Sequence, residues 1–97
     1  MTVSKLGDGK AARIVYAELP KHIGGGCCLE GKNYLIVINN TLARIQQYYA
    51  LGHEIAHICL GHLTSDRPSS VIESEANSLA WDYYRLYKKG ELFISFC

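Results

Sequence analysis

The sequence lacks the features that mark several classes of protein. It has no block of basic residues and its formal net charge is only +1, so nothing indicates direct binding to nucleic acid. No long apolar run precedes Asp8, so we expect no signal peptide, no membrane span and a cytoplasmic location. Gly9-Lys10 does not have the upstream glycine of a phosphate-binding loop. With 48% hydrophobic residues and no low-complexity tract, the chain is not of the disordered class.

Cysteine is scarce and irregularly spaced. Cys27 and Cys28 are adjacent, whereas Cys59 and Cys97 each stand alone. This spacing matches neither paired C-x-x-C zinc ligands nor a secreted disulfide framework, so we expect free thiols. A structural zinc site that uses Cys27 or Cys28 is an alternative, because thiolates bind zinc well.

The stretch His53-Glu54-Ile55-Ala56-His57 has the H-E-x-x-H pattern of zinc hydrolases. Helical residues advance by about 100° each, so both imidazoles project from one face and can bind the same zinc ion. Zinc would lower the pKa of its water to about 7, and Glu54 would accept the proton as the catalytic base.

The alternative is an accidental match on an amphipathic helix, with the three side chains in solvent. The flanking residues argue against it, because the segment from Tyr48 to Leu60 is apolar nearly all round, which is typical of a buried helix. Two buried histidines and a glutamate without partners would cost several kcal/mol, and a metal ion supplies the missing partner.

The third protein ligand must come from elsewhere in the chain. An extended site would need glycine at position 60 and histidine at 63, but both residues are leucine. His62 lies about 140° around the helix from His57, so it cannot join the pair unless the helix ends first. We expect Gly61 to end the helix in a left-handed conformation. We expect His62 to lie in a loop or to support a metal ligand without binding the metal itself.

Two glutamates on the next helical segment are candidates for that ligand. We favour Glu73, because Asn77 lies four residues further along the same face and would orient a zinc-bound group. Glu75 is the other choice. Ser70-x-x-Glu73 also has the pattern of a capping box, in which the glutamate would only close the start of the helix. Two histidines and one glutamate would leave the fourth position for water, as in catalytic zinc sites.

These motifs together resemble the ImmA/IrrE family of zinc metallopeptidases. The resemblance rests on residues 53–57, on Leu60-Gly61-His62 and on residues 73–80, and it extends loosely over 13–86. It implies limited proteolysis, often of a DNA-binding repressor that controls a mobile element or a stress response.

The pattern predicts an α+β fold of one minimal zincin-like domain over residues 1–97. A small antiparallel sheet or hairpin would pack on the motif helix, and a second helix would carry the glutamate ligand. We expect strands over residues 13–19, 27–30 and 34–39, a glycine loop at 24–26, helices over 41 or 42 to 60 and over 71 to 88 or 89, and a final strand or contact over 92–96. Asn39-Asn40-Thr41 is interpreted as a turn and helix start, not as a glycosylation site.

Three functions are compatible with these features. The first is a zinc-dependent endopeptidase that cleaves a specific cytoplasmic protein, held by strand addition to the hairpin. The second is a zinc-stabilised protein-interaction module without turnover, and the third is a structural domain without metal. A donor for the developing oxyanion is also needed. We assign none, the candidates being Tyr34, Tyr48, Tyr83, Tyr84 and His62.

Overall fold

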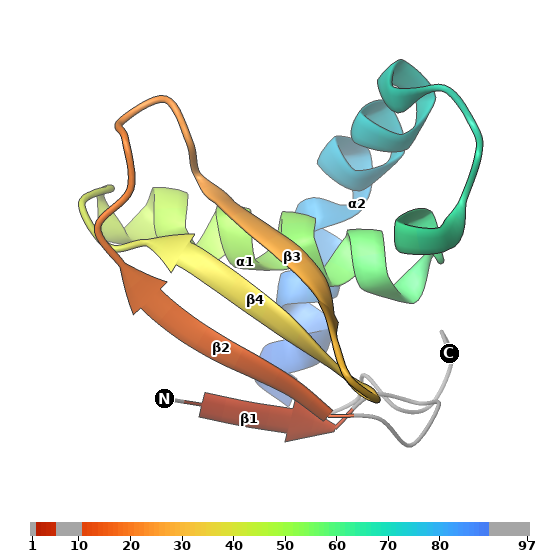
Figure 1. The fold of residues 1–97 in the computed structure, drawn as a ribbon. Coiled ribbons are helices and arrows are strands. Elements are labelled where there is room, and N and C mark those ends of the chain that lie inside the picture. The colour runs from red at the N-terminus through yellow and green to blue at the C-terminus, as the bar shows by residue number, and fades with distance from the viewer. Residues whose placement is uncertain (1, 6–10, 90–97) are drawn as a thin grey trace.

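The computed structural model of the chain describes residues 2–5 and 11–89, which form one sheet and two long helices (Figure 1). The sheet contains β1 (Thr2–Lys5), β2 (Ala11–Ala17), β3 (Gly25–Glu30) and β4 (Asn33–Asn39), in the spatial order β1-β2-β4-β3. The expected α+β class and the hairpin, formed by β3 and β4, are both confirmed. Strand β3 lies at an edge of the sheet.

The sheet as a whole is mixed, whereas we expected a small antiparallel sheet or a hairpin. Strands β3 and β4 are antiparallel, but β2 runs parallel to β4, with Ile14 opposite Ile36. The reason is that β4 inserts between β2 and β3, so the chain has already reversed twice when it reaches β4. Strand β1, which pairs antiparallel with β2, was not predicted, and the expected segment 92–96 lies outside the described residues.

Helix α1 (Arg44–Cys59) lies against one face of the sheet, and α2 (Ser69–Lys89) crosses it on the side away from the strands (Figure 1). The sheet contributes Ile14, Ile36 and Ile38 to the core, and α1 contributes Leu51 and Ile55. These residues alternate along the strands and recur at helical spacing on α1, so each element buries one face. None of the helices in the described part of the chain has both the length and the apolar character needed to cross a membrane.

The helix ends lie within three residues of the expected positions. Helix α1 begins after Ala43, whose backbone N–H donates to Gln46 Oε1 at 3.2 Å. It does not begin at Thr41, because the hydroxyl of Thr41 is hydrogen-bonded to Asn39. Gly61 has the left-handed conformation that we expected, with φ of 73°, and a short 3-10 helix, η1 (His62–Thr64), follows it. Helix α2 begins at Ser69, two residues earlier than expected.

Asn39 is fully buried and connects two segments of backbone. Its Nδ2 donates to the carbonyl oxygens of Leu19, Pro20 and Ile23 at 3.1, 3.1 and 2.9 Å. Its Oδ1 accepts from the backbone N–H and the hydroxyl of Thr41 at 3.0 and 2.7 Å. The side chain has no exposed surface, so it is a turn and loop anchor and is closed to glycosylation in the folded protein.

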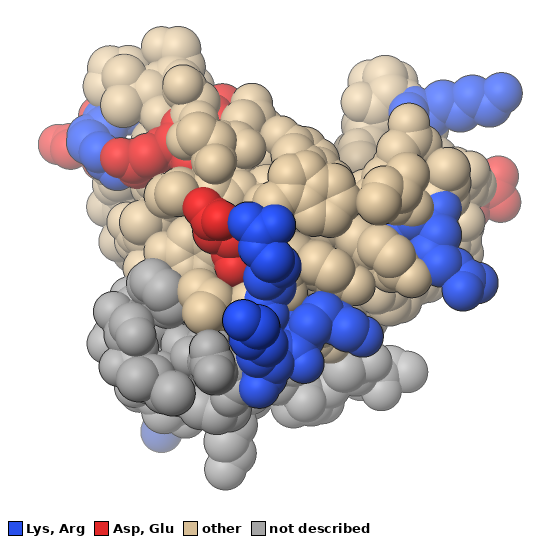
Figure 2. Space-filling model, turned by 180° about the vertical axis from the view of Figure 1, so that it is seen from behind, with Lys and Arg blue, Asp and Glu red and all other residues tan. Residues whose placement is uncertain are grey.

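Figure 2 shows the opposite side of the molecule, on which basic side chains form a small group beside acidic ones, amid largely uncharged surface. Asp82 and Arg85 form an ion pair of 2.6 Å on α2, and Lys88 and Lys89 stand in its last turn. Cations at this end of a helix are favourable because they complement the helix dipole.

The two helices touch most closely where Gly52 of α1 meets Ala80 of α2. A Cβ atom added at Gly52 would overlap the carbonyl oxygen of Ala80 and lie 3.0 Å from the Cβ of Tyr84. Backbone cannot move aside as a flexible side chain can, so only glycine allows this approach. The crossing fixes how α1 and α2 present their side chains to each other.

We therefore expect Gly52→Ala to lower the free energy of unfolding by about 1–3 kcal/mol, the usual cost of overpacking. Helix propensity alone would favour alanine by about 1 kcal/mol, so the sign of the change decides between the two effects. Urea denaturation in the presence of a chelator measures it. Gly26→Ala, in strand β3, is the control for an added methyl group that meets no obstacle, because its Cβ would have nothing within 4 Å. A stabilised Gly52→Ala variant would show that the helices are not in contact here.

Candidate metal centre

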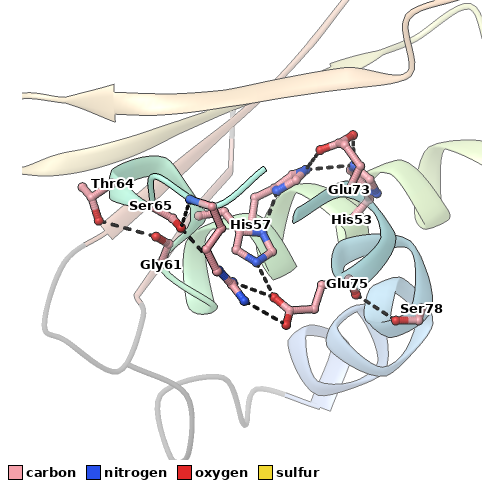
Figure 3. A network of polar contacts seen from close by, with 10 residues as sticks. His53, His57, Gly61, Thr64, Ser65, Glu73, Glu75 and Ser78 are labelled. Carbon is pink, nitrogen blue, oxygen red and sulfur yellow. Dashed lines mark hydrogen bonds and ion pairs between the residues drawn. The ribbon is translucent and has the colours of Figure 1, made fainter. Parts of the chain in front are cut away.

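His53 and His57 stand one turn apart on α1 and point to the same place (Figure 3). Their Nε2 atoms are 3.0 Å apart, and their side chains are only 14% and 11% exposed. Burial lowers the pKa of His57, and the adjacent His53 acts in the same direction. Neutral imidazole is the form that binds metal ions.

The third side chain at this point is Glu73, from the second turn of α2. Its Oε2 lies 2.7 Å from His57 Nε2 and its Oε1 lies 3.4 Å from His53 Nε2. One ligand atom from each of the three residues lies within 4.8 Å of the others. The Glu73 carboxylate therefore contacts the histidine pair across the helix crossing, which is not the position of a group that closes a helix start.

The three donors fit a zinc ion. Zinc–ligand bonds of about 2.0–2.1 Å in a tetrahedral arrangement place neighbouring donors about 3.3 Å apart. The two Nε2 atoms are 3.0 Å apart, and the Glu73 carboxylate lies 3.4 Å from one of them through Oε1 and 2.7 Å from the other through Oε2, so the three groups stand at separations near that value. Two imidazoles and one carboxylate are also the donor set of many catalytic zinc sites.

Glu75 points elsewhere. Its Oε1 lies 2.6 Å from His62 Nε2 and 2.9 Å from the Arg67 guanidinium. Residues 73 and 75 differ by about 200° in direction on a helix, so only one of them can face α1 at this height. Glu73 therefore faces the pair His53 and His57, whereas Glu75 contacts His62.

Glu54 lies beside the histidine pair and is 6% exposed. Burial raises the pKa of this carboxyl group, while a hydrogen bond from the Cys27 thiol and the nearby His53 oppose the rise. Burial and the charge of Glu54 in turn raise the pKa of Cys27, so the thiol stays protonated and donates to the carboxylate. A carboxylate in such surroundings is a stronger base than one in water.

These groups line an open cleft of about 610 Å³. One wall is the loop and first half of β3, from His22 to Cys27, and the floor is α1. The other wall is formed by η1 and the first turns of α2. The cleft is therefore bounded by an edge strand on one side and by the glutamate-bearing helix on the other.

Asn77 lines the cleft, but its amide faces α1. Its Oδ1 accepts a hydrogen bond of 3.0 Å from the hydroxyl of Tyr49. The expected role of Asn77 in orienting a zinc-bound group stays a prediction, because its hydrogen bond with Tyr49 joins the two helices beside the donor cluster.

Two polar residues of the cleft, Tyr49 and His22, were not predicted from the sequence, nor was the contact between Cys27 and Glu54. Tyr49 precedes His53 by four residues, so helical spacing alone would have placed it on the same face. His22 and the contact between Cys27 and Glu54 depend on where the loop and β3 pack, and they left no local signal. Of the five candidate oxyanion donors, His62 alone lines the cleft among the described residues, and both its ring nitrogens already have partners.

The three cysteines in the described part of the chain do not form a cluster of ligands. Cys27, Cys28 and Cys59 are not joined in disulfide bonds, as expected, and Cys97 lies outside the described residues. Cys28 is exposed and Cys59 is buried in the core, so Cys27 alone of the three reaches the cleft, where it is bonded to Glu54.

Comparison with protein families gives a match over most of the chain. The model of a peptidase family, the IrrE N-terminal-like domain, covers residues 8–83. The chain belongs to this family. Searches of curated proteins and of solved structures found no significant match. The match includes both helices that carry the IrrE-like donor cluster, so the predicted resemblance to ImmA/IrrE metallopeptidases is confirmed.

Proposed function

We propose that this IrrE-like chain is a zinc-dependent endopeptidase that cleaves a specific cytoplasmic protein. The observation that carries the proposal is the His53–His57–Glu73 cluster in an open cleft, with the buried Glu54 beside it. Membership in a peptidase family supports the same function. By the resemblance, a DNA-binding repressor of a mobile element or stress response is the kind of substrate that we propose.

His53, His57 and Glu73 would hold the zinc ion, which supplies activation of water and polarisation of the peptide carbonyl. Glu54 accepts a proton from the attacking water and returns it to the nitrogen of the leaving amine. The Cys27 thiol keeps the Glu54 carboxylate directed into the cleft, since it donates a hydrogen bond to it. The buried position of Glu54 limits competing hydration of its charge.

Strand β3 would bind the backbone of the substrate. It is the edge strand of the sheet, and its first half forms a wall of the cleft. An edge strand presents unpaired N–H and C=O groups, to which an extended peptide can add as a further strand. A peptide bound in this way would pass the donor cluster in an extended conformation, which suits cleavage of a mobile loop or linker in a target protein.

Metal removal tests the proposal. Protein purified without chelator should contain about one zinc ion per chain, the occupancy expected of a three-ligand site. Chelation should abolish cleavage, and added zinc should restore it. Because the substrate is unknown, labelling of newly formed N-termini in a lysate of the source organism is the suitable readout.

The outcomes separate the three functions. A chain that binds no zinc would contradict the proposal and support a metal-free structural domain. A chain that binds zinc tightly and produces no new N-termini would be a zinc-stabilised interaction module.

A further inference from the structure

We propose that His62, Glu75 and Arg67 form a positioning series behind His57 that fixes the tautomer of this ring and sets the affinity of the site for zinc. The inference rests on the proposed zinc site but concerns residues outside the donor cluster. None of the three belongs to the donor cluster, so their effect on the ion passes through His57.

The series is continuous and made of short contacts (Figure 3). His57 Nδ1 and His62 Nδ1 are 2.9 Å apart, and His62 Nε2 lies 2.6 Å from Glu75 Oε1. Arg67 reaches the same carboxylate through two nitrogens, at 2.9 and 3.4 Å. The contacts lead from the ring nitrogen of His57 that faces away from the donors to a guanidinium at the surface.

Only one arrangement of protons satisfies every contact when His57 binds a metal ion through Nε2. The His57 proton then sits on Nδ1 and is donated to His62 Nδ1. His62 consequently carries its proton on Nε2 and donates it to the Glu75 carboxylate. Arg67, which is always a donor, completes the series. A carboxylate at the far end therefore determines which nitrogen of His57 is free for the ion.

Local structure holds these residues in place. Gly61, in its left-handed conformation, turns the chain so that η1 brings His62 under α1, where its side chain is 1% exposed. Arg67 is fixed by Ser65, whose Oγ accepts from its backbone N–H at 3.1 Å and from its Nε at 3.4 Å. A buried imidazole with partners on both nitrogens has one orientation only.

The other histidine of the donor cluster, His53, has no such hydrogen-bonded support among the described residues. Nδ1 of His53 is buried and has no hydrogen-bond partner within the described part of the chain. Loss of the partner of a metal-binding histidine typically lowers metal affinity by 10–100-fold. Since His57 alone has a partner here, we expect the whole of that effect to depend on the series.

The test compares zinc dissociation constants, measured by competition with a chromophoric chelator, for Glu75→Ala and Asp82→Ala. Asp82 is the matched control, because it is an acidic residue of the same helix that is also paired with an arginine, but away from the cleft. We expect Glu75→Ala to weaken zinc binding by about 10–100-fold and Asp82→Ala to leave it unchanged. Glu75→Gln, which keeps an acceptor for His62, should recover part of the loss.

Two further measurements distinguish positioning from other roles. The visible spectrum of the cobalt-substituted Glu75→Ala protein should keep its tetrahedral form, and a collapse of that spectrum would show that Glu75 is itself a ligand. Urea midpoints of the metal-free variants should agree, so that a loss of affinity is not a loss of folding. If the wild type binds zinc and the two alanine variants bind it with equal affinity, the positioning role of the series is wrong and the proposed zinc site still stands. Wild type that binds no zinc would overturn the proposed function.

Discussion

Replacing Glu54 by glutamine is expected to reduce cleavage by about 10²–10⁴-fold while zinc stays bound, because a positioned general base contributes a factor of that size. Glutamine has nearly the same shape as glutamate and can accept the Cys27 hydrogen bond, but it cannot take up the proton of water. The fold and the donor cluster should therefore be preserved. Zinc content and the yield of new N-termini, measured on the same preparation, check this expectation.

The control for this substitution is Glu18→Gln, which removes an exposed carboxylate outside the cleft. It should leave both zinc content and cleavage at the wild-type level. Undiminished cleavage by Glu54→Gln would rule out Glu54 as the base. Loss of zinc from that variant would instead place Glu54 among the metal ligands.

Replacing Glu73 by glutamine is expected to remove zinc, whereas Glu75→Gln should still be loaded at millimolar zinc. Loss of a supporting residue lowers metal affinity by 10–100-fold, so loss of a ligand should lower it by more than about 100-fold. The two residues are of the same type and two positions apart, so each is the control for the other. Equilibrium dialysis followed by metal analysis measures both. Retention of zinc by Glu73→Gln, with loss from Glu75→Gln, would reverse the assignment.

The histidine pair was predictable from the sequence because its geometry is local. Two residues four apart in a helix share a face whatever surrounds the helix, so His53 and His57 had to meet once α1 formed. Gly61 was predictable for a similar reason, since a glycine after the last apolar residue commonly ends a helix in the left-handed region. The hairpin of β3 and β4 depends on neighbouring residues and a short turn.

The choice between Glu73 and Glu75 was not decidable in this way. It depends on how α2 lies over α1, and this is set by the close approach of Gly52 and Ala80, which are far apart in the sequence. The parallel pairing of β2 with β4 was not predicted for the same reason: the residue pattern of a strand does not show which other strands pair with it. Residues 25 and 26, expected in a loop, continue β3 because Val37 and Ile38 of β4 pair with them.

The burial of Asn39 limits how this cleft can be redesigned. One amide holds the carbonyl groups of Leu19, Pro20 and Ile23 on one side and the turn before α1 on the other. Insertions or deletions that shift any of these carbonyls would also disturb the turn that leads into the histidine-bearing helix. Grafting of a foreign loop to change substrate preference is therefore best confined to Lys21 and His22, the exposed positions between the anchored carbonyls, of which His22 already faces the cleft.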